Sequence, residues 1–204
     1  MSEFGRADIH LKPSDPRPSG DPVVRASTAS STAPSRSTRL PLPGRIAAYR
    51  LLLVIAVLVF ALDQITKAWI SAHLSFGTYG EPHAIRVIRN VFYLVHVGNT
   101  GAAWSLFAGQ SVILASLAGA TLVAIFIWRR ALGLRDRASQ IGFGLLCGGI
   151  AGNLTDRLIH GHVIDFLDVH IGSYIYPTFN VADSGICIGV ILYLWHSLRN
   201  PEKE

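Results

Sequence analysis

Two carboxylates lie beside apolar stretches of the sequence, with no lysine or arginine close to either. Asp165 is in "HGHVIDFLDVH", and Asp183 is in "FNVADSGI", which runs into "ICIGVILYLWHSL". Two close carboxylates that share one proton avoid mutual repulsion and offer a general acid and a general base at one site. Asp165 and Asp183 are therefore a candidate aspartyl pair, able to activate water against an amide carbonyl and protonate the departing amine.

The other charged residues near apolar sequence supply too few bases to neutralise the acids. Asp63 and Lys67 are four residues apart, so they share a helical face and can form a structural ion pair. Asp156 and Arg157 are adjacent, so their side chains point apart and each needs a partner on another segment. With the candidate pair this makes four acids against two bases. Ionisable groups inside a membrane usually pair or mark function. If Asp165 and Asp183 share one proton, the excess of two negative charges falls to one.

Uncharged residues in the same motifs have supporting interpretations. Asn153 lies one helical turn before Asp156 and is interpreted as a hydrogen-bonding residue behind the site. In "GNTGAAWS", Asn99 could donate to a peptide carbonyl, and Gly101 leaves room for backbone or substrate. In "GFGLLCGGIAG", glycines recur at the small-xxx-small spacing that lets helices approach closely, which favours a packing role.

The composition indicates a membrane protein. Of 204 residues, 50% are hydrophobic and only 15% are charged. The formal net charge of +5 does not form a basic stripe interleaved with aromatic residues, so nucleic acid is not an expected partner. The two cysteines lie inside apolar runs, which gives no disulfide framework.

The elements that must position these residues are four apolar segments, each about the 20 residues needed to cross a bilayer. They are predicted at Leu51 to Ile70, Leu106 to Trp128, Ser139 to Leu158 and Ala182 to Leu198. Fourteen of the 18 lysines and arginines lie before the first segment, between the second and third, or after the fourth. By the positive-inside rule both termini are expected in the cytoplasm, and all the polar motifs meet near the outer face.

The predicted fold is an all-α integral membrane protein with four transmembrane helices. Residues 1–44 are rich in Ser, Pro and Arg and are predicted to be a disordered cytoplasmic tail, and residues 45–200 are predicted to form the membrane domain. The segment "HAIRVIRNVFYLVHV" is β-branched and aromatic, which predicts a small extracytoplasmic β-element between the first two helices.

Five motifs in this order resemble the bacterial lipoprotein signal peptidases, or signal peptidase II family, over about residues 46–198. They are "DQITK", "NTGAAWS", "GNLTDR", "VIDF" and "FNVAD". The resemblance implies that Asp165 and Asp183 are catalytic. It also implies that the other polar motif residues bind substrate or brace the site: Asp63, Lys67, Asn99, Gly101, Asn153, Asp156, Arg157 and Asn180. Trp104 departs from the phenylalanine usual in the family, and the tail is longer than usual.

The same resemblance implies an aspartic endopeptidase of the bacterial cytoplasmic (inner) membrane. Its expected partners are membrane lipid and prolipoproteins, which it would cleave just before a diacylglyceryl-modified cysteine, with globomycin-type cyclic peptides as inhibitors. No metal or other cofactor is implied. Two alternatives remain open from the residues alone. A metal-dependent membrane hydrolase could use the histidines and acids of "HGHVIDFLDVH", and a small four-helix carrier could use a protonatable site.

Overall fold

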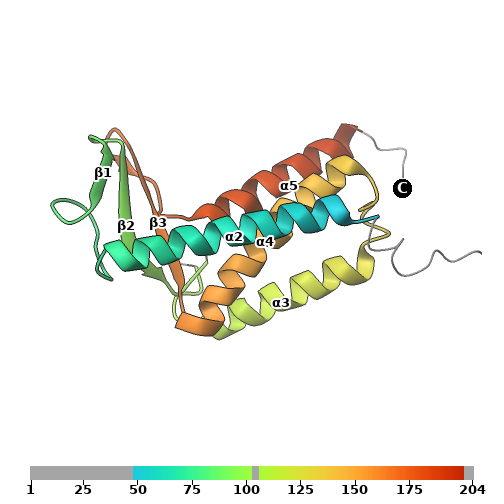
Figure 1. Cartoon of the computed structure of the whole chain (residues 1–204), viewed down its shortest axis with the longest axis horizontal. Helices are drawn as coiled ribbons and strands as arrows, with labels where there is room; N and C mark the ends of the chain where they lie inside the picture. Colours follow the sequence, from blue (N-terminus) through green and yellow to red (C-terminus); the bar gives the residue numbers. More distant parts are fainter. Residues whose placement is uncertain (1–47, 103–105, 200–204) are drawn as a thin grey trace, which may run out of the picture. The chain divides into compact units, whose positions relative to one another are not determined.

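The computed structural model describes residues 48–102 and 106–199. The predicted tail and three residues of "NTGAAWS" lie outside these ranges. The described helices match the four predicted apolar segments to within about five residues, and strands connect them at one end (Figure 1). The helices are α2 (Arg50–His73), α3 (Ser111–Trp128), α4 (Arg137–His160) and α5 (Val181–Arg199), and the strands are β1 (Ile85–Ile88), β2 (Phe92–Asn99), β3 (Val163–Ile171) and β4 (Tyr174–Ile175).

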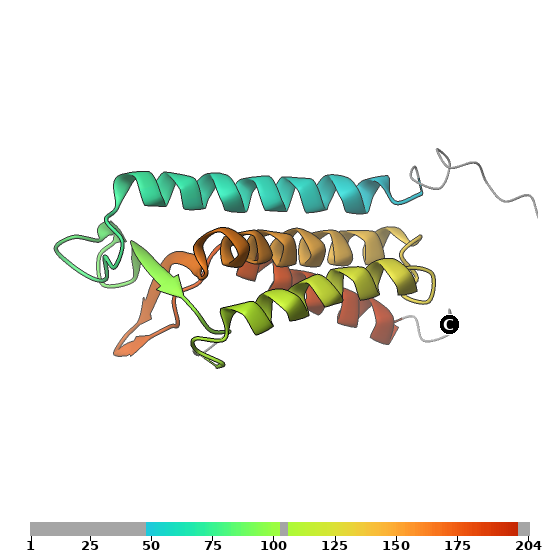
Figure 2. The same cartoon turned by 90° about the horizontal axis from the view of Figure 1, so that it is seen from below.

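Helix α4 packs against each of the other three helices (Figure 2). The predicted role of its glycines in packing is confirmed, because Gly144, Gly148 and Gly152 all face α2. A Cβ atom added at Gly148 would lie 2.6 Å from the carbonyl oxygen of Ala56. Only glycine allows the two helix backbones to come so close.

Three described helices, α2, α3 and α5, are long and apolar enough to cross a membrane, with mean hydropathies of 2.1, 2.2 and 1.5. Helix α4 has 24 residues but does not meet this criterion. Several of its buried residues are polar, among them Gln140, Asn153 and Asp156. A helix enclosed by its neighbours does not need an apolar surface, so the polar composition of α4 follows from its position.

The β-element is larger than predicted, and the all-α description is incomplete. Four antiparallel strands form one sheet in the order β1-β2-β3-β4. The sequence prediction placed a β-element only between the first two helices, whereas β3 and β4 come from the segment between α4 and α5. The segment "HGHVIDFLDVH" carries β-branched and aromatic residues beside its carboxylates and histidines, which is the composition of a strand. Its β-branched and aromatic residues instead pair with β2, which brings Asp165 opposite Val97.

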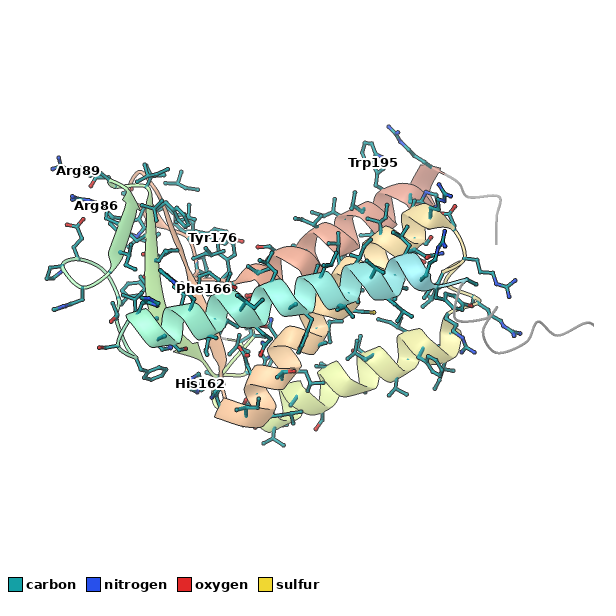
Figure 3. All side chains as sticks on the ribbon, in the orientation of Figure 1. Arg86, Arg89, His162, Phe166, Tyr176 and Trp195 are labelled. Carbon is teal, nitrogen blue, oxygen red and sulfur yellow. The ribbon has the colours of Figure 1, made fainter. Side chains whose placement is uncertain are left out.

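A small apolar core fixes the sheet to the end of α2. Ile70 of α2 and Leu74, which directly follows this helix, pack against Ile164 and Phe166 of β3. Figure 3 shows Phe166 at this junction, with Arg86 and Arg89 at the far edge of the sheet and Trp195 near the opposite end of the helices. Because Phe166 follows Asp165 directly, burial of its ring holds the neighbouring carboxylate on the other side of the strand.

Candidate active site

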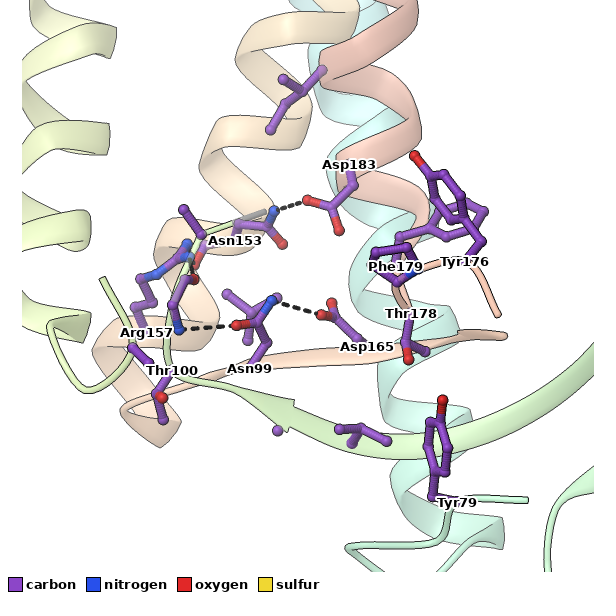
Figure 4. A pocket seen from close by; sticks show the side chains of 18 of the residues that line it. Tyr79, Asn99, Thr100, Asn153, Arg157, Asp165, Tyr176, Thr178, Phe179 and Asp183 are labelled. Atoms are coloured by element: carbon purple, nitrogen blue, oxygen red, sulfur yellow. Dashed lines mark hydrogen bonds between the residues drawn. The ribbon is translucent and has the colours of Figure 1, made fainter. Parts of the chain in front are cut away.

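Asp165 is a buried carboxylate that receives two side-chain hydrogen bonds. Asn99 Nδ2, at the end of β2, donates to Asp165 Oδ2 at 3.0 Å, and Asn180 Nδ2 donates to Asp165 Oδ1 at 2.7 Å. The carboxylate is 2% exposed, and Figure 4 shows it directed into the same space as Asp183. The two amides fix the orientation of the carboxylate plane, because each oxygen has its own donor.

Asp183 is held by the N-terminal cap of α5. Asn180 Oδ1 accepts from the Asp183 amide at 2.9 Å, while Asp183 Oδ2 accepts from the Asn180 amide at 3.2 Å. This reciprocal arrangement is a capping box. Asn153 Nδ2 on α4 donates to the other oxygen, Oδ1, at 2.7 Å. The N-x-x-D spacing of residues 180 to 183 is a sequence signal for this cap.

Lys67 forms the centre of a buried charged network behind the two carboxylates. Its Nζ lies 2.8 Å from Asp63 Oδ2, 2.8 Å from Asp156 Oδ2 and 3.0 Å from Asn153 Oδ1. Lys67 is 2% exposed, and its three donors have three acceptors. The predicted pairing of Asp63 with Lys67 is present, and the partner that Asp156 needed on another segment is the same lysine.

The two acids of this network also attach separate elements to one another. Asp63 Oδ1 on α2 accepts from the Ala182 amide in the first turn of α5 at 2.9 Å. Asp156 Oδ2 on α4 accepts from the Ile164 amide of β3 at 3.0 Å. Each contact fixes the residue next to a candidate catalytic acid. The network therefore sets the positions of Asp165 and Asp183 through the backbone as well as through side chains.

Gln64 belongs to the network and was missed by the sequence analysis. Its Nε2 donates to Asp156 Oδ1 at 3.0 Å and to Asp63 Oδ2 at 3.2 Å. A glutamine on an apolar helix next to Asp63 could have drawn attention, since an amide there needs partners inside the protein. Its contacts place it between the two acids that hold Lys67.

Arg157 and Gly101 form the wall of the site on the α4 side. Arg157 Nη2 donates to the Gly101 carbonyl at 2.9 Å, and the Gly101 amide donates to Asn99 Oδ1 at 2.9 Å. Arg157 therefore finds its partner outside α4, as its adjacency to Asp156 required. Asn99 in turn donates to Asp165, so these hydrogen bonds connect Arg157 to Asp165 and fix the backbone at Gly101 beside the site.

A cavity of about 570 Å³ contains both candidate acids. Its wall includes Asn99, Gly101, Asn153 and Arg157, together with the aromatic residues Tyr79, Tyr176 and Phe179. Among the residues behind this wall are Asp63, Lys67, Asp156 and Asn180. The structure thus brings all ten predicted site residues to one end of the helices, with two carboxylates facing the cavity.

The surroundings of Asp165 favour its protonated form. Burial, and then the negative charge of Asp183, raise the pKa of Asp165 to about 7, although hydrogen bonds from Asn99 and Asn180 and the charge of Lys67 act to lower it. A carboxyl group with such a pKa can carry a proton near neutral pH. Asp183 lines the same cavity as Asp165.

The alternative of a metal site is not supported by a cluster of ligands. Among residues 48–102 and 106–199, no three His, Cys, Asp or Glu side chains are arranged to hold an ion. The candidate ligands of "HGHVIDFLDVH" have other contacts. His170 Nε2 is 2.8 Å from Asp168 Oδ2, and the ring of His162 lies 5.1 Å from that of Phe76.

Solved structures define the class of protein to which this fold belongs. One, a bacterial membrane enzyme determined by the in meso method at 2.3 Å resolution, has a TM-score of 0.67 and 31% identity over 75% of this chain and 90% of its own. A second bacterial membrane enzyme, determined by the same method at 1.9 Å, has a TM-score of 0.64 and 32% identity over 73% and 93% of the two chains. The fold is therefore that of a helical membrane enzyme.

Sequence comparisons identify the family within this class. The family model described as signal peptidase (SPase) II matches residues 55–199. The lipoprotein signal peptidase of Janthinobacterium sp. (strain Marseille) is 40% identical over 73% of this chain and 88% of its own length. That of Geobacillus kaustophilus (strain HTA426) is 38% identical over 73% and 95%. The chain belongs to the signal peptidase II family, as the order of its motifs predicted.

Proposed function

We propose that Asp165 and Asp183 are the catalytic pair with which this signal peptidase removes signal peptides from prolipoproteins. Membership of the signal peptidase II family makes the chain an aspartic protease of this type. The observation that supports the assignment is the geometry of the cavity. Two carboxylates from different elements line it, each is oriented by asparagine side chains, and Asp165 has a pKa raised to about 7.

In the proposed mechanism Asp165 carries the shared proton and Asp183 is ionised. Asp183 takes a proton from a water molecule, and the oxygen of that water attacks the carbonyl carbon of the scissile peptide bond. Asp165 donates its proton to the carbonyl oxygen. The C–N bond of the resulting gem-diol intermediate then breaks. The amine leaves with the proton that Asp183 had gained, and Asp165 takes a proton back from one of the two hydroxyl groups as the new carboxyl group forms. One carboxyl and one carboxylate remain at the end, as at the start.

The buried network has a positioning role in this mechanism. Lys67 holds Asn153 Oδ1 at 3.0 Å, so the Nδ2 of the same amide faces Asp183 at 2.7 Å. Asn180 donates to both Asn153 and Asp165 from its Nδ2, at 3.2 and 2.7 Å. These contacts keep the two carboxylates in a fixed mutual orientation before substrate arrives, which lowers the reorganisation that the reaction requires.

The arrangement in the membrane is part of the proposal. α4 would cross the bilayer as the third of four spans, packed against the other three helices, and both chain termini would lie in the cytoplasm of a bacterial inner-membrane protein. The basic residues at the inner ends of α3 and α4 support this orientation. The sheet and cavity would then lie near the outer face, and residues 1–44 would be a cytoplasmic tail.

The substrate would be a prolipoprotein whose cysteine already carries a diacylglyceryl group, cut just before that residue. Acyl chains in the bilayer would hold the scissile bond at the depth of the cavity, so binding energy away from the reacting atoms would assist the reaction. Globomycin-type peptides would compete for the same cavity. Trp104, which lies outside the described residues, is a candidate for an effect on substrate fit.

A cleavage assay tests this proposal. Purified protein in detergent is incubated with a diacylglyceryl-modified prolipoprotein and, as a matched control, with the same prolipoprotein lacking the lipid. We expect a shortened product only from the modified substrate, and we expect globomycin to block its formation. Cleavage of both forms at equal rates would overturn the lipid requirement, and no cleavage of either form by well-folded protein would overturn the function.

A further inference from the structure

The segment between β4 and α5 forms a free edge of the sheet within the wall of the cavity. β4 is the last strand in the order β1-β2-β3-β4, so among the described strands it has a neighbour on one side only. Residues 175–179, which lead from β4 toward α5, all line the cavity that holds Asp165 and Asp183. The unpaired side of an edge strand offers amide and carbonyl groups to another extended chain. The catalytic pair gives this edge no role.

Two residues of the segment bulge away from β3. The amides of Tyr176 and Phe179 both donate to carbonyl groups of β3, at 2.8 and 3.1 Å. The two donors are three positions apart in the sequence, whereas the two residues that accept are only two positions apart. Pro177 and Thr178 therefore occupy the space of one residue, which makes them a β-bulge. Residues in a bulge are left without partners in the strand ladder.

The residues on either side hold this bulge in place. The rings of Tyr176 and Phe179 lie edge to face, with centroids 5.7 Å apart and an interplanar angle of 86°. The Phe179 carbonyl accepts from the amides of Phe166 and Leu167 on β3, at 3.1 and 2.8 Å. The bulge is thus anchored at both ends before any ligand binds. An edge that is already ordered loses little conformational freedom when a peptide pairs with it.

Thr178 is the residue of the bulge whose backbone can pair with a peptide. No hydrogen bond joins its amide or its carbonyl to another residue within 48–102 and 106–199. Its neighbours limit the pairing to this one residue, because Pro177 has no amide N–H and the Phe179 amide already donates to β3. A proline on a free edge also hinders the addition of a long strand. The edge therefore suits a short stretch of extended peptide.

Thr178 is also close along the chain to the residue that holds both proposed catalytic acids. Asn180 donates to Asp165 at 2.7 Å and accepts from the Asp183 amide at 2.9 Å. Two residues of extended chain span about 7 Å. Figure 4 shows Thr178 and Asp165 on the wall of the same cavity. A peptide residue paired with Thr178 would accordingly lie within about two residues of a scissile bond held at the acids.

We propose that the backbone of Thr178 binds the prolipoprotein as an added extended strand, on the carboxyl side of the lipid-modified cysteine. The proposal rests on the function given above. The apolar part of a signal peptide lies in the bilayer, and the sheet side of the cavity is assigned to the outer face, so the chain that reaches the sheet is the part after the cysteine. The Thr178 carbonyl accepts from one amide of this part, and the Thr178 amide donates to one of its carbonyls.

Ester substitutions in the substrate test this pairing with the wild-type enzyme. Lipid-modified prolipoprotein peptides are synthesised in which oxygen replaces the backbone N–H of the first, second or third residue after the cysteine. The Thr178 carbonyl accepts from a single N–H, and successive amides of an extended chain point to opposite sides. We therefore expect one of the three esters to raise KM about three- to tenfold with kcat nearly unchanged. The esters at the other two positions are the matched controls, and they should keep the KM of the parent peptide.

Thr178→Pro tests the pairing from the side of the protein, with Tm measured in parallel. The proline removes the only free amide of the bulge, so KM for the parent peptide should rise about three- to tenfold. The ester that is selective with wild type should cost less in this variant, because the two hydrogen bonds of one residue pair are coupled.

Three results would overturn the proposal: equal KM values for the parent peptide and all three esters, similar losses at all three positions, or a folded Thr178→Pro protein with the KM of wild type. If Thr178→Pro does not fold, the ester series with the wild-type enzyme decides alone. Cleavage of the parent peptide by the wild type is measured in the same experiment. Its absence would show failure of the proposed function, which is distinct from each of these three results.

Discussion

Replacing Asp165 by asparagine is expected to inactivate the protein and to remove a loss of stability that the wild type undergoes as pH rises. The pKa of Asp165 is raised to about 7 in the folded protein, whereas an aspartate in the unfolded chain titrates near 3.9. The folded state therefore holds the proton more tightly, and the free energy of unfolding falls as pH rises from about 4 to about 7. Between about pH 5 and about pH 8 the wild type should lose about 2.5 kcal/mol that Asp165→Asn does not lose.

The variant also alters hydrogen bonds, because an asparagine amide cannot accept from both Asn99 and Asn180. This cost is largely common to the two pH values, so the change with pH isolates the effect of ionisation. The assay is thermal unfolding in detergent followed by tryptophan fluorescence. Relative to wild type, the Tm of Asp165→Asn should rise by about 5–10 °C between about pH 5 and about pH 8, at 2–4 °C per kcal/mol.

The control for this prediction is Glu81→Gln. Glu81 forms an ion pair with Arg86 at 3.3 Å, and its side chain is 49% exposed. Removing this carboxylate does not remove a buried charge, so its Tm relative to wild type should change little with pH. If Asp165→Asn behaves like Glu81→Gln, Asp165 does not hold a proton near neutral pH, and its assignment as the acid of the pair is refuted.

Three further predictions concern the network, the helix packing and the requirement for metal. Asp63→Ala leaves Lys67 with one carboxylate partner in a buried site and should destabilise the protein by about 3–5 kcal/mol; a stable but inactive variant would instead place Asp63 in the chemistry. Gly148→Ala should destabilise the protein by about 1–3 kcal/mol, because its Cβ would meet the α2 backbone. The control, Gly119→Ala on α3, meets nothing within 4 Å and should be at least as stable as wild type. Similar Tm values for these two variants would exclude the packing role. Cleavage should survive EDTA, and complete loss restored by zinc would support the metal alternative.

Much of the site could be predicted because apolar segments and positive charges constrain a membrane chain strongly. The segment lengths and the distribution of arginines predicted that the polar motifs meet at one end of the helices. The structure does join Asn99 to Asp165 and Lys67 to Asn153 there. The i,i+4 spacing of Asp63 and Lys67 likewise predicted a pair that is present at 2.8 Å.

The remaining features depend on pairing between distant segments, which periodicity does not specify. The partnership of Lys67 with Asp156 joins two helices, and it could be inferred from sequence only as a need for some partner. The pairing of β2 with β3 joins loops on either side of α3 and α4, so the sheet was predicted too small. The polar composition of α4 reflects its enclosure by other helices, a tertiary property that its own sequence cannot reveal.

The most direct test of the catalytic pair is the cleavage rate of Asp165→Asn, Asp183→Asn and the double variant on lipid-modified prolipoprotein, with insertion and Tm measured in parallel. Asparagine keeps the size of aspartate but cannot exchange the proton. Each single variant should therefore be folded and inactive, and the double variant should be no worse, since residues that act as a unit are not additive. The wild-type rate should rise and fall with pH, reporting two apparent pKa values that belong to the pair. A folded single variant that retains substantial turnover would contradict the aspartyl mechanism.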